Sequence, residues 1–189
     1  MKYILLLILA LVSGCAEGYP IRDVALRLEF AGGGICSGTA VSDDVILTAA
    51  HCFINGRLTT INGKPAHALK LVDDGQDHVL VRVSRRFHRW TVIGPEPVQG
   101  QHVRMYGQPA GIEFAYRELY VSFVTDHEVM LDGGHTYGGD SGAGLMDAQG
   151  RLVGVISGVK WLRSKEGIVF SLVWTNRLRF SAKQLRDMR

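Results

Sequence analysis

Several features that would define a function class are missing from this chain of 189 residues. No apolar run reaches the roughly 20 residues that a transmembrane helix needs. Neither an HExxH motif nor paired Cys and His residues indicate a metal site. Neither sign of charge dominates, since the formal net charge is +3, so nucleic-acid binding is not indicated. Without repeats or low-complexity segments, the chain has the length and apolar content of one globular domain.

The N-terminal segment has the pattern of a secretory signal peptide. Lys2 precedes an apolar run over residues 4–12, and small residues follow it. A charged start, an apolar stretch of about 7–15 residues and a small-residue exit are typical of such peptides. Residues 12–15 (VSGC) also resemble the bacterial lipobox, in which the cysteine becomes the lipidated first residue. An ordinary signal peptide that ends near a cysteine is the alternative.

This interpretation predicts the organisation of the chain. A lipoprotein-type signal peptide covers residues 1–14, a short tether covers 15–22, and one folded domain covers 23–189. A diacylglycerol and an N-acyl chain on Cys15 would give stable membrane attachment, because two or more chains suffice. We therefore expect an exported monomer, either lipid-anchored on the periplasmic side of the cell envelope or secreted.

Cysteine is scarce, since the chain contains only Cys36 and Cys52 besides Cys15. In an exported protein an isolated pair favours a disulfide. The two lie 16 positions apart, and closing a loop of that size stabilises a fold by about 3 kcal/mol in the chain-entropy model. A reactive cysteine nucleophile is the competing hypothesis, but no motif typical of cysteine proteases surrounds either residue.

From Asp23 onward, short runs alternate between apolar and polar residues and are separated by turn signals. We expect strands at 24–30, 37–41, 45–48, 79–83, 103–106, 119–125, 129–131, 143–146, 152–157 and 168–172. Many short strands at this spacing favour an all-β sandwich or barrel. One helix is expected over Ser181–Met188 with Ser181 as its N-cap. Residues 94–100 would join two halves of one fold.

Basic and histidine residues outside the motifs described below are expected to be structural or solvated. Arg85, Arg86, His88 and Arg89 form the densest basic cluster, for which a solvated loop is favoured over an anion-binding site. His67, His78, His102 and His127 are likewise expected to serve the fold or the surface.

Three local patterns supply the parts of acyl-transfer chemistry. Residues 48–52 (TAAHC) follow an apolar strand, residues 77–81 (DHVLV) begin one, and residues 138–142 (GGDSG) form a glycine-rich turn before another. The Ser141 hydroxyl needs a general base, and His51 can accept and return its proton. Asp77 would orient the imidazole, and backbone N–H groups around Ser141 would stabilise an oxyanion.

These motifs resemble the trypsin/chymotrypsin family of serine proteases. Residues 36–41 (CSGTAV), 47–53 (LTAAHCF) and 139–142 (GDSG) are similar to its signatures and follow its order of His, Asp and Ser. The resemblance covers about Val24 to the end. It implies two packed six-stranded antiparallel β-barrels, a catalytic cleft between them and a C-terminal α-helix. It also implies a Cys36–Cys52 disulfide and an oxyanion hole formed by the N–H groups of Gly139 and Ser141.

Asp73 and Asp74 are alternatives to Asp77 as the acidic member of the triad. The family's aspartate begins an apolar strand, and residues 79–83 follow Asp77 in this way. Asp73 and Asp74 precede Gly75 and have the pattern of turn residues. We therefore predict His51, Asp77 and Ser141 as the catalytic residues.

The sequence departs from the family in two places that bear on activation and specificity. Ala143 and Gly144 stand where a Gly-Pro pair is familiar, and the Ile-Val-Gly-Gly start of zymogen-activated members is absent. We therefore expect the oxyanion hole to form without proteolytic activation.

The resemblance also locates the primary specificity pocket. Its base corresponds to His135, so cleavage after Arg or Lys, which uses an aspartate there, is not indicated. His135 with Thr136 favours a polar or acidic substrate side chain, whereas the opposite wall, at Ser157, Gly158 and Val159, contains no histidine. Val159 replaces a usual glycine and would narrow the entrance.

The sequence thus predicts a serine endopeptidase that acts on proteins or peptides and requires no cofactor and no metal. A protease-like fold retained as a non-catalytic binding or assembly module is the alternative, because a fold does not determine a function. An esterase or other acyl hydrolase that uses the same residues is a third hypothesis.

Overall fold

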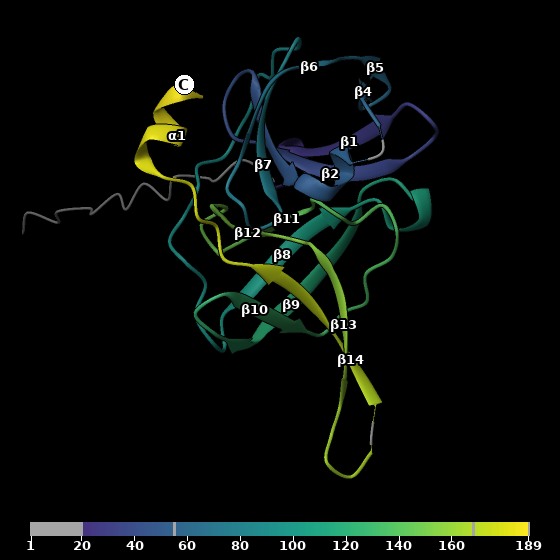
Figure 1. Cartoon of the computed structure of the whole chain (residues 1–189), viewed down its shortest axis with the longest axis vertical. Coiled ribbons are helices and arrows are strands. Elements are labelled where there is room, and N and C mark those ends of the chain that lie inside the picture. The colour runs from purple at the N-terminus through teal and green to yellow at the C-terminus, as the bar shows by residue number, and fades with distance from the viewer. Residues whose placement is uncertain (1–20, 55, 168, 189) are drawn as a thin grey trace, which may run out of the picture.

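Two curled antiparallel sheets make up the protein, one from each half of the chain. The computed structural model describes residues 21–54, 56–167 and 169–188. In Figure 1 the sheet of the first half, coloured purple to blue-green, lies above the sheet of the second half, coloured teal to yellow-green. Each sheet contains seven strands. The predicted signal peptide, Cys15 and most of the tether lie outside the described residues.

The first sheet has the strand order β5-β4-β1-β2-β3-β7-β6. Alternating apolar side chains from these strands point into one cluster that includes Leu28, Ile46 and Val81. The strands are β1 (Ala25–Phe30), β2 (Ile35–Ala40), β3 (Val45–Ala49), β4 (Leu58–Ile61), β5 (Lys64–Pro65), β6 (Ala68–Asp73) and β7 (His78–Val83).

The second sheet has the strand order β12-β11-β8-β9-β10-β14-β13. Its own apolar cluster includes Met105, Leu119 and Leu145. The hairpin of β13 and β14 extends well beyond the body of the molecule (Figure 1). The strands are β8 (His102–Gly107), β9 (Ala115–Val124), β10 (Glu128–Asp132), β11 (Gly144–Met146), β12 (Leu152–Val155), β13 (Gly158–Arg163) and β14 (Val169–Asn176).

A third apolar cluster joins the two sheets and the C-terminal helix. It combines Leu47 of β3 and Leu80 of β7 with Leu152 of β12 and with Met188, which follows the helix. The helix α1 (Ala182–Asp187) begins with a capping box, in which the Ser181 hydroxyl accepts a hydrogen bond from the Gln184 N–H. It lies beside the first sheet although it follows the second in sequence (Figure 1). Short 3₁₀ turns occur at η1 (Ile21–Asp23), η2 (Ala50–Phe53) and η3 (Pro109–Gly111).

The predicted all-β class with two packed halves and a C-terminal helix is confirmed. The strand count differs, because each sheet has seven strands where the resemblance implied six. β4, β5, β6 and β13 were not predicted, and Asp73 is the last residue of β6 where a turn was expected. Among the described residues, no helix is long and apolar enough to cross a membrane.

Candidate active site

His51 lies in the 3₁₀ turn η2, directly after the fully buried strand β3. The predicted disulfide is present: Cys36 of β2 and Cys52 are joined with a Cα–Cα distance of 6.4 Å. This bond ties the turn that carries His51 to the middle of the first sheet. The imidazole is thereby held at the edge of a rigid element, with 37% of its side chain exposed.

Asp77 accepts two kinds of hydrogen bond from His51. Its Oδ2 lies 2.9 Å from the His51 Nδ1, and its Oδ1 accepts the His51 backbone N–H at 2.9 Å. Burial acts to raise the pKa of the Asp77 carboxyl, but the hydrogen bonds from the His51 side chain and backbone and the charge of His51 together hold the pKa below its ordinary value. The carboxylate is therefore ionised and fixes the Nδ1–H form of the imidazole.

Ser141 lies between two tight backbone positions that fit only glycine. A Cβ on Gly139 would lie 2.1 Å from the Gln108 carbonyl oxygen, and one on Gly142 would lie 2.1 Å from the Ser37 carbonyl oxygen. The Ser141 carbonyl accepts the Ser37 N–H at 2.8 Å. These contacts place Ser141 of the second half beside β2 and β3 of the first, the strands next to His51.

The hydroxyl of Ser141 forms no hydrogen bond to His51 within the described residues. Catalytic hydrogen bonds are often long before substrate binds and shorten in the complex. The structure therefore joins His51 to Asp77 directly and brings Ser141 to the same edge through its backbone.

Two backbone N–H groups beside Ser141 are open. In the part of the chain that the structure describes, the N–H groups of Gly139 and Ser141 donate to no protein acceptor, whereas the N–H of Asp140 donates to the Tyr137 carbonyl and that of Gly142 to the Ile156 carbonyl. Gly139 adopts a φ of 102°, which an L side chain rarely allows. These are the two donors that the sequence predicted for an oxyanion hole.

Asp140 has a partner that sequence analysis missed. Its carboxylate is fully buried and forms a bidentate ion pair with the Arg117 guanidinium of β9. Arg117 also donates to the His135 carbonyl at 2.7 Å, and the Asp140 Oδ2 accepts the Tyr137 N–H at 2.9 Å. The pair thus fixes both ends of the loop before Ser141. No local sequence pattern marked Arg117 as the partner of Asp140.

Three of the five predicted substrate-binding residues line one pocket. His135, Thr136 and Val159 surround a cavity of about 240 Å³, with Trp161 and Ser171 from the β13–β14 hairpin. Trp161 lies two positions after Val159 on β13, the spacing that places side chains on one face of a strand. Sequence analysis did not name Trp161 as a pocket residue, and its spacing of two positions from Val159 was the signal that could have indicated it.

The other two predicted residues lie elsewhere. Ser157 is buried beside Asp77, and Gly158 pairs with Trp174 at the start of the hairpin. The pocket lining contains no carboxylate.

The other basic and histidine residues named from the sequence have structural partners. Arg86 and Arg89 of the basic cluster pair with Asp43 and Asp23. His102 pairs with Glu118 at 3.1 Å, whereas His78 is fully buried against Asp74. Among the described residues, no group of three His, Cys, Asp or Glu side chains could hold a metal ion.

Similar folds are found among solved proteases. The Rv3671c protease from M. tuberculosis, in its active form, has a TM-score of 0.71 and 17% identity, over 89% of this chain and 82% of that chain. A Glu endopeptidase has a TM-score of 0.64 and 14% identity, over 89% and 91%. A scabies mite inactivated protease paralogue has a TM-score of 0.64 and 15% identity, over 91% and 97%. At these identities, the likeness concerns the fold alone.

No curated protein matches the sequence. A family model described as a trypsin-like peptidase domain, however, matches residues 36–155. This match spans His51, Asp77 and Ser141 together with both cysteines of the disulfide. With the two packed sheets and the disulfide beside His51, it establishes that the chain belongs to the family of trypsin-like peptidases.

Proposed function

We propose that the protein is a serine endopeptidase in which Ser141 is the nucleophile, His51 the general acid and base, and Asp77 the orienting carboxylate. The observation that carries the proposal is a prearranged set of hydrogen-bonding groups. The Asp77 Oδ2 accepts from the His51 Nδ1 at 2.9 Å, and the N–H groups of Gly139 and Ser141 are open. A fold that serves only for binding has no need of either arrangement.

The proposed reaction proceeds through an acyl-enzyme. His51 Nε2 takes the proton as the Ser141 Oγ attacks the peptide carbonyl carbon, and the N–H groups of Gly139 and Ser141 donate to the oxyanion. The imidazolium then gives its proton to the leaving amine as the C–N bond breaks. Water, deprotonated by His51, attacks the acyl-enzyme, and Ser141 regains its proton. This cycle requires no metal and no cofactor.

The Arg117–Asp140 pair supports the expectation that no activating cleavage is needed. In this chain the buried Asp140 carboxylate already has a guanidinium partner, so a newly cut N-terminus is not required to neutralise it. A purified mature form that gained activity only after a cut near its N-terminus would contradict this part of the proposal.

Labelling by a fluorophosphonate probe tests the proposal. We expect residues 20–189 to be labelled, and Ser141→Ala and His51→Ala to be unlabelled while folding normally. A folded wild type with the disulfide intact that stays unlabelled would favour the binding-module alternative. Comparison of peptide with ester substrates would then separate an endopeptidase from an esterase.

For the substrate we propose a polar or acidic side chain in the 240 Å³ pocket. Thr136 and Ser171 supply hydroxyls, His135 supplies an imidazole, and no carboxylate is present to bind Arg or Lys. Cleavage of a peptide library would show the preference directly. Dominant cleavage after Arg or Lys would contradict the assignment.

We further propose that the protein is exported and anchored to the cell envelope through acyl chains on Cys15, or secreted if Cys15 is not lipidated. The support is the VSGC sequence at residues 12–15. Incorporation of radiolabelled palmitate into the wild type but not into Cys15→Ala would distinguish the two. A monomer is the expected state in gel filtration.

A further inference from the structure

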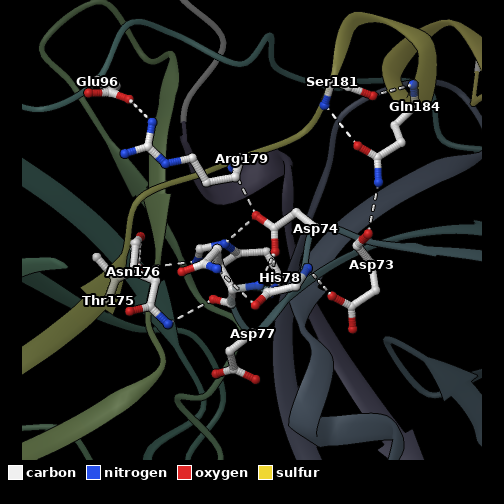
Figure 2. Close-up of polar contacts among 12 residues, drawn as sticks. Asp73, Asp74, Asp77, His78, Glu96, Thr175, Asn176, Arg179, Ser181 and Gln184 are labelled. Atoms are coloured by element: carbon white, nitrogen blue, oxygen red, sulfur yellow. Dashed lines mark hydrogen bonds and ion pairs between the residues drawn. The ribbon is translucent and has the colours of Figure 1, made fainter. Parts of the chain in front are cut away.

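A second histidine–aspartate pair lies directly behind the turn that carries Asp77. Asp74 and His78, four residues apart, have fully buried side chains, with the Asp74 Oδ2 2.9 Å from the His78 Nδ1. Figure 2 shows this pair at the centre of a set of polar contacts between the two halves of the protein. We call Asp74, His78, Thr175, Asn176 and Arg179 the Asp74 cluster.

The Asp74 carboxylate fixes the backbone on both sides of Asp77. Its Oδ1 accepts the N–H of Gln76 at 2.8 Å and that of His78 at 3.2 Å. The Asp74 N–H in turn donates to the His78 carbonyl at 3.1 Å. Asp77 lies between these anchored residues, and its own carboxylate points away from the cluster in Figure 2.

Asp77 needs this support because its backbone is in the left-handed region. Its φ is 67°, a conformation that costs a residue other than glycine free energy and persists only where the surroundings impose it. In the first sheet the Asp77 carbonyl accepts the Ala50 N–H at 2.9 Å. The turn is therefore held from the His51 side by this bond and by the hydrogen bonds of His51 to the Asp77 carboxylate, and from the opposite side by Asp74.

The second half of the chain holds the same turn from outside the first sheet. The Asn176 Nδ2 donates to the Gln76 carbonyl at 2.9 Å, and the Arg179 N–H donates to the Asp74 Oδ2 at 2.9 Å. Thr175 of β14 places its Oγ1 3.4 Å from the His78 Nε2. The triad spans both halves, so a link between them at this turn controls where Asp77 stands relative to Ser141.

The other charged side chains near Asp74 have partners of their own. The Arg179 guanidinium donates to Glu96 and to the Asp126 carbonyl, and Asp73 accepts the Gly75 N–H at 2.5 Å. His78 is therefore the cationic or hydrogen-bonding side chain that matches the buried Asp74. Burial acts to raise the pKa of the Asp74 carboxyl, and the His78 hydrogen bond and charge and the N–H donors more than offset it.

We infer that Asp74 and His78 are positioning residues, which hold the Asp77 carboxylate against His51 by locking the turn between β6 and β7 to β14. The inference rests on the proposed function and deepens it. Neither residue contacts the reacting atoms. Their effect reaches the chemistry only through the place and direction of Asp77.

The chain offers a matched control in the second sheet. Asp147, between β11 and β12, accepts the N–H groups two and four residues ahead, those of Gln149 and Arg151, and pairs with the side chain four residues ahead. Its side chain is 3% exposed. It thus has the bonding of Asp74 in a turn that carries no proposed catalytic residue.

The test compares Asp74→Ala, Asp74→Asn and Asp147→Ala by the kinetics of fluorophosphonate inactivation. For Asp74→Ala we expect kinact to fall about 10- to 100-fold with KI unchanged, because small misplacements of catalytic groups have effects of this size. Asp74→Asn retains one oxygen for the turn N–H groups and is expected to recover most of the rate. Asp147→Ala is expected to lose stability but to keep kinact per folded molecule.

A spectroscopic signal tests the same inference without activity. The proton in the His51 Nδ1–H to Asp77 hydrogen bond should give a low-field ¹H resonance that is lost in Asp74→Ala and retained in Asp147→Ala. If the wild type is not labelled at all, the proposed function fails, and this resonance alone decides the inference.

Three outcomes would overturn it. They are a folded Asp74→Ala that keeps both kinact and the resonance, an equal loss of kinact in Asp147→Ala, and an Asp74→Asn that is no faster than Asp74→Ala. Should Asp74→Ala fail to fold, Asn176→Ala removes only the outer tie to Gln76. A reduced kinact with unchanged KI would then support the inference, and an unchanged kinact would refute it.

Discussion

A buried carboxylate beside the nucleophile makes the loop before Ser141 depend on one strand residue. Asp140 is fully buried, and the Arg117 guanidinium that neutralises it is 17% exposed. Removing one partner of such a pair leaves an uncompensated buried charge. The same guanidinium donates to the His135 carbonyl, so the pocket and the oxyanion loop share this support.

Arg117→Ala is therefore expected to affect both stability and labelling. The free energy of unfolding should fall by about 3–5 kcal/mol, and the folded fraction should react slowly with the probe because the Gly139 and Ser141 N–H groups lose their fixed direction. Urea denaturation and fluorophosphonate kinetics measure the two effects. Arg117→Lys, which keeps the charge but loses the bidentate geometry, should be intermediate. Normal stability in Arg117→Ala would contradict the importance given to the pair.

The charge and the hydrogen bond of Asp77 are expected to support catalysis. The Asp77→Asn variant tests this, because asparagine keeps the shape of the side chain and removes its charge. Asp77→Asn should lower kinact about 10⁴-fold, because an amide no longer selects the Nδ1–H tautomer of His51. Asp132→Asn, at an exposed position at the end of β10, serves as the control and should react like the wild type. A loss of less than tenfold in Asp77→Asn would argue against the proposed triad.

At the scale of elements, the disulfide joins β2 to the turn η2 that carries His51. Replacing both cysteines by serine should lower the free energy of unfolding by about 3 kcal/mol, the loop-closure value for 16 residues. Chemical denaturation with and without reductant measures it, and the variant should be insensitive to reductant. If reduction leaves the wild-type midpoint unchanged, the bond is not a stabilising element.

The elements that the sequence predicted are those with at least one buried face. Strand β1 alternates buried and half-buried residues, and β3 is buried throughout, so both carry a strong apolar pattern. β6 is mostly exposed, β5 has only two residues, and β13 carries exposed Trp161. Strands at the margins of a sheet pack few side chains and leave little periodicity to detect.

The candidate site also contains residues that a local pattern marks and residues that it does not. The motifs around His51 and Ser141 are local in sequence, so the sequence alone could point to these residues, and the strand that follows Asp77 favoured it over Asp74. Arg117 with Asp140 and His78 with Thr175 are contacts across 23 and 97 positions. No local pattern announces such pairs, because they form only when the sheets pack.

At the scale of the whole molecule, the two halves meet through an apolar cluster and a polar one. Leu47 and Leu80 of the first sheet pack against Leu152 of the second, and the Asp74 cluster lies between β7 and β14. Apolar contact stabilises the association of the halves, but because it is non-directional it does not fix their relative orientation. The hydrogen-bonded cluster adds a specific alignment, which is what a site divided between two halves needs.

Because this alignment relies on ionised carboxylates, we expect the free energy of unfolding to fall at acid pH. Asp74 and Asp77 both have pKa values below the ordinary 3.8. A carboxyl whose pKa is lower in the folded than in the unfolded state stabilises the fold fully above its unfolded pKa, and the contribution is lost as the pH falls through the lower folded value. We therefore expect these groups to change the urea midpoint little between about pH 7 and pH 5 and to lower it at pH values below about 4.

The gap in unfolding free energy between the wild type and Asp74→Asn should shrink over the same acid range, because protonation removes from the wild type the charge that the variant already lacks. A gap that stayed constant down to about pH 2.5 would mean that the Asp74 carboxylate charge contributes nothing to holding the halves in register.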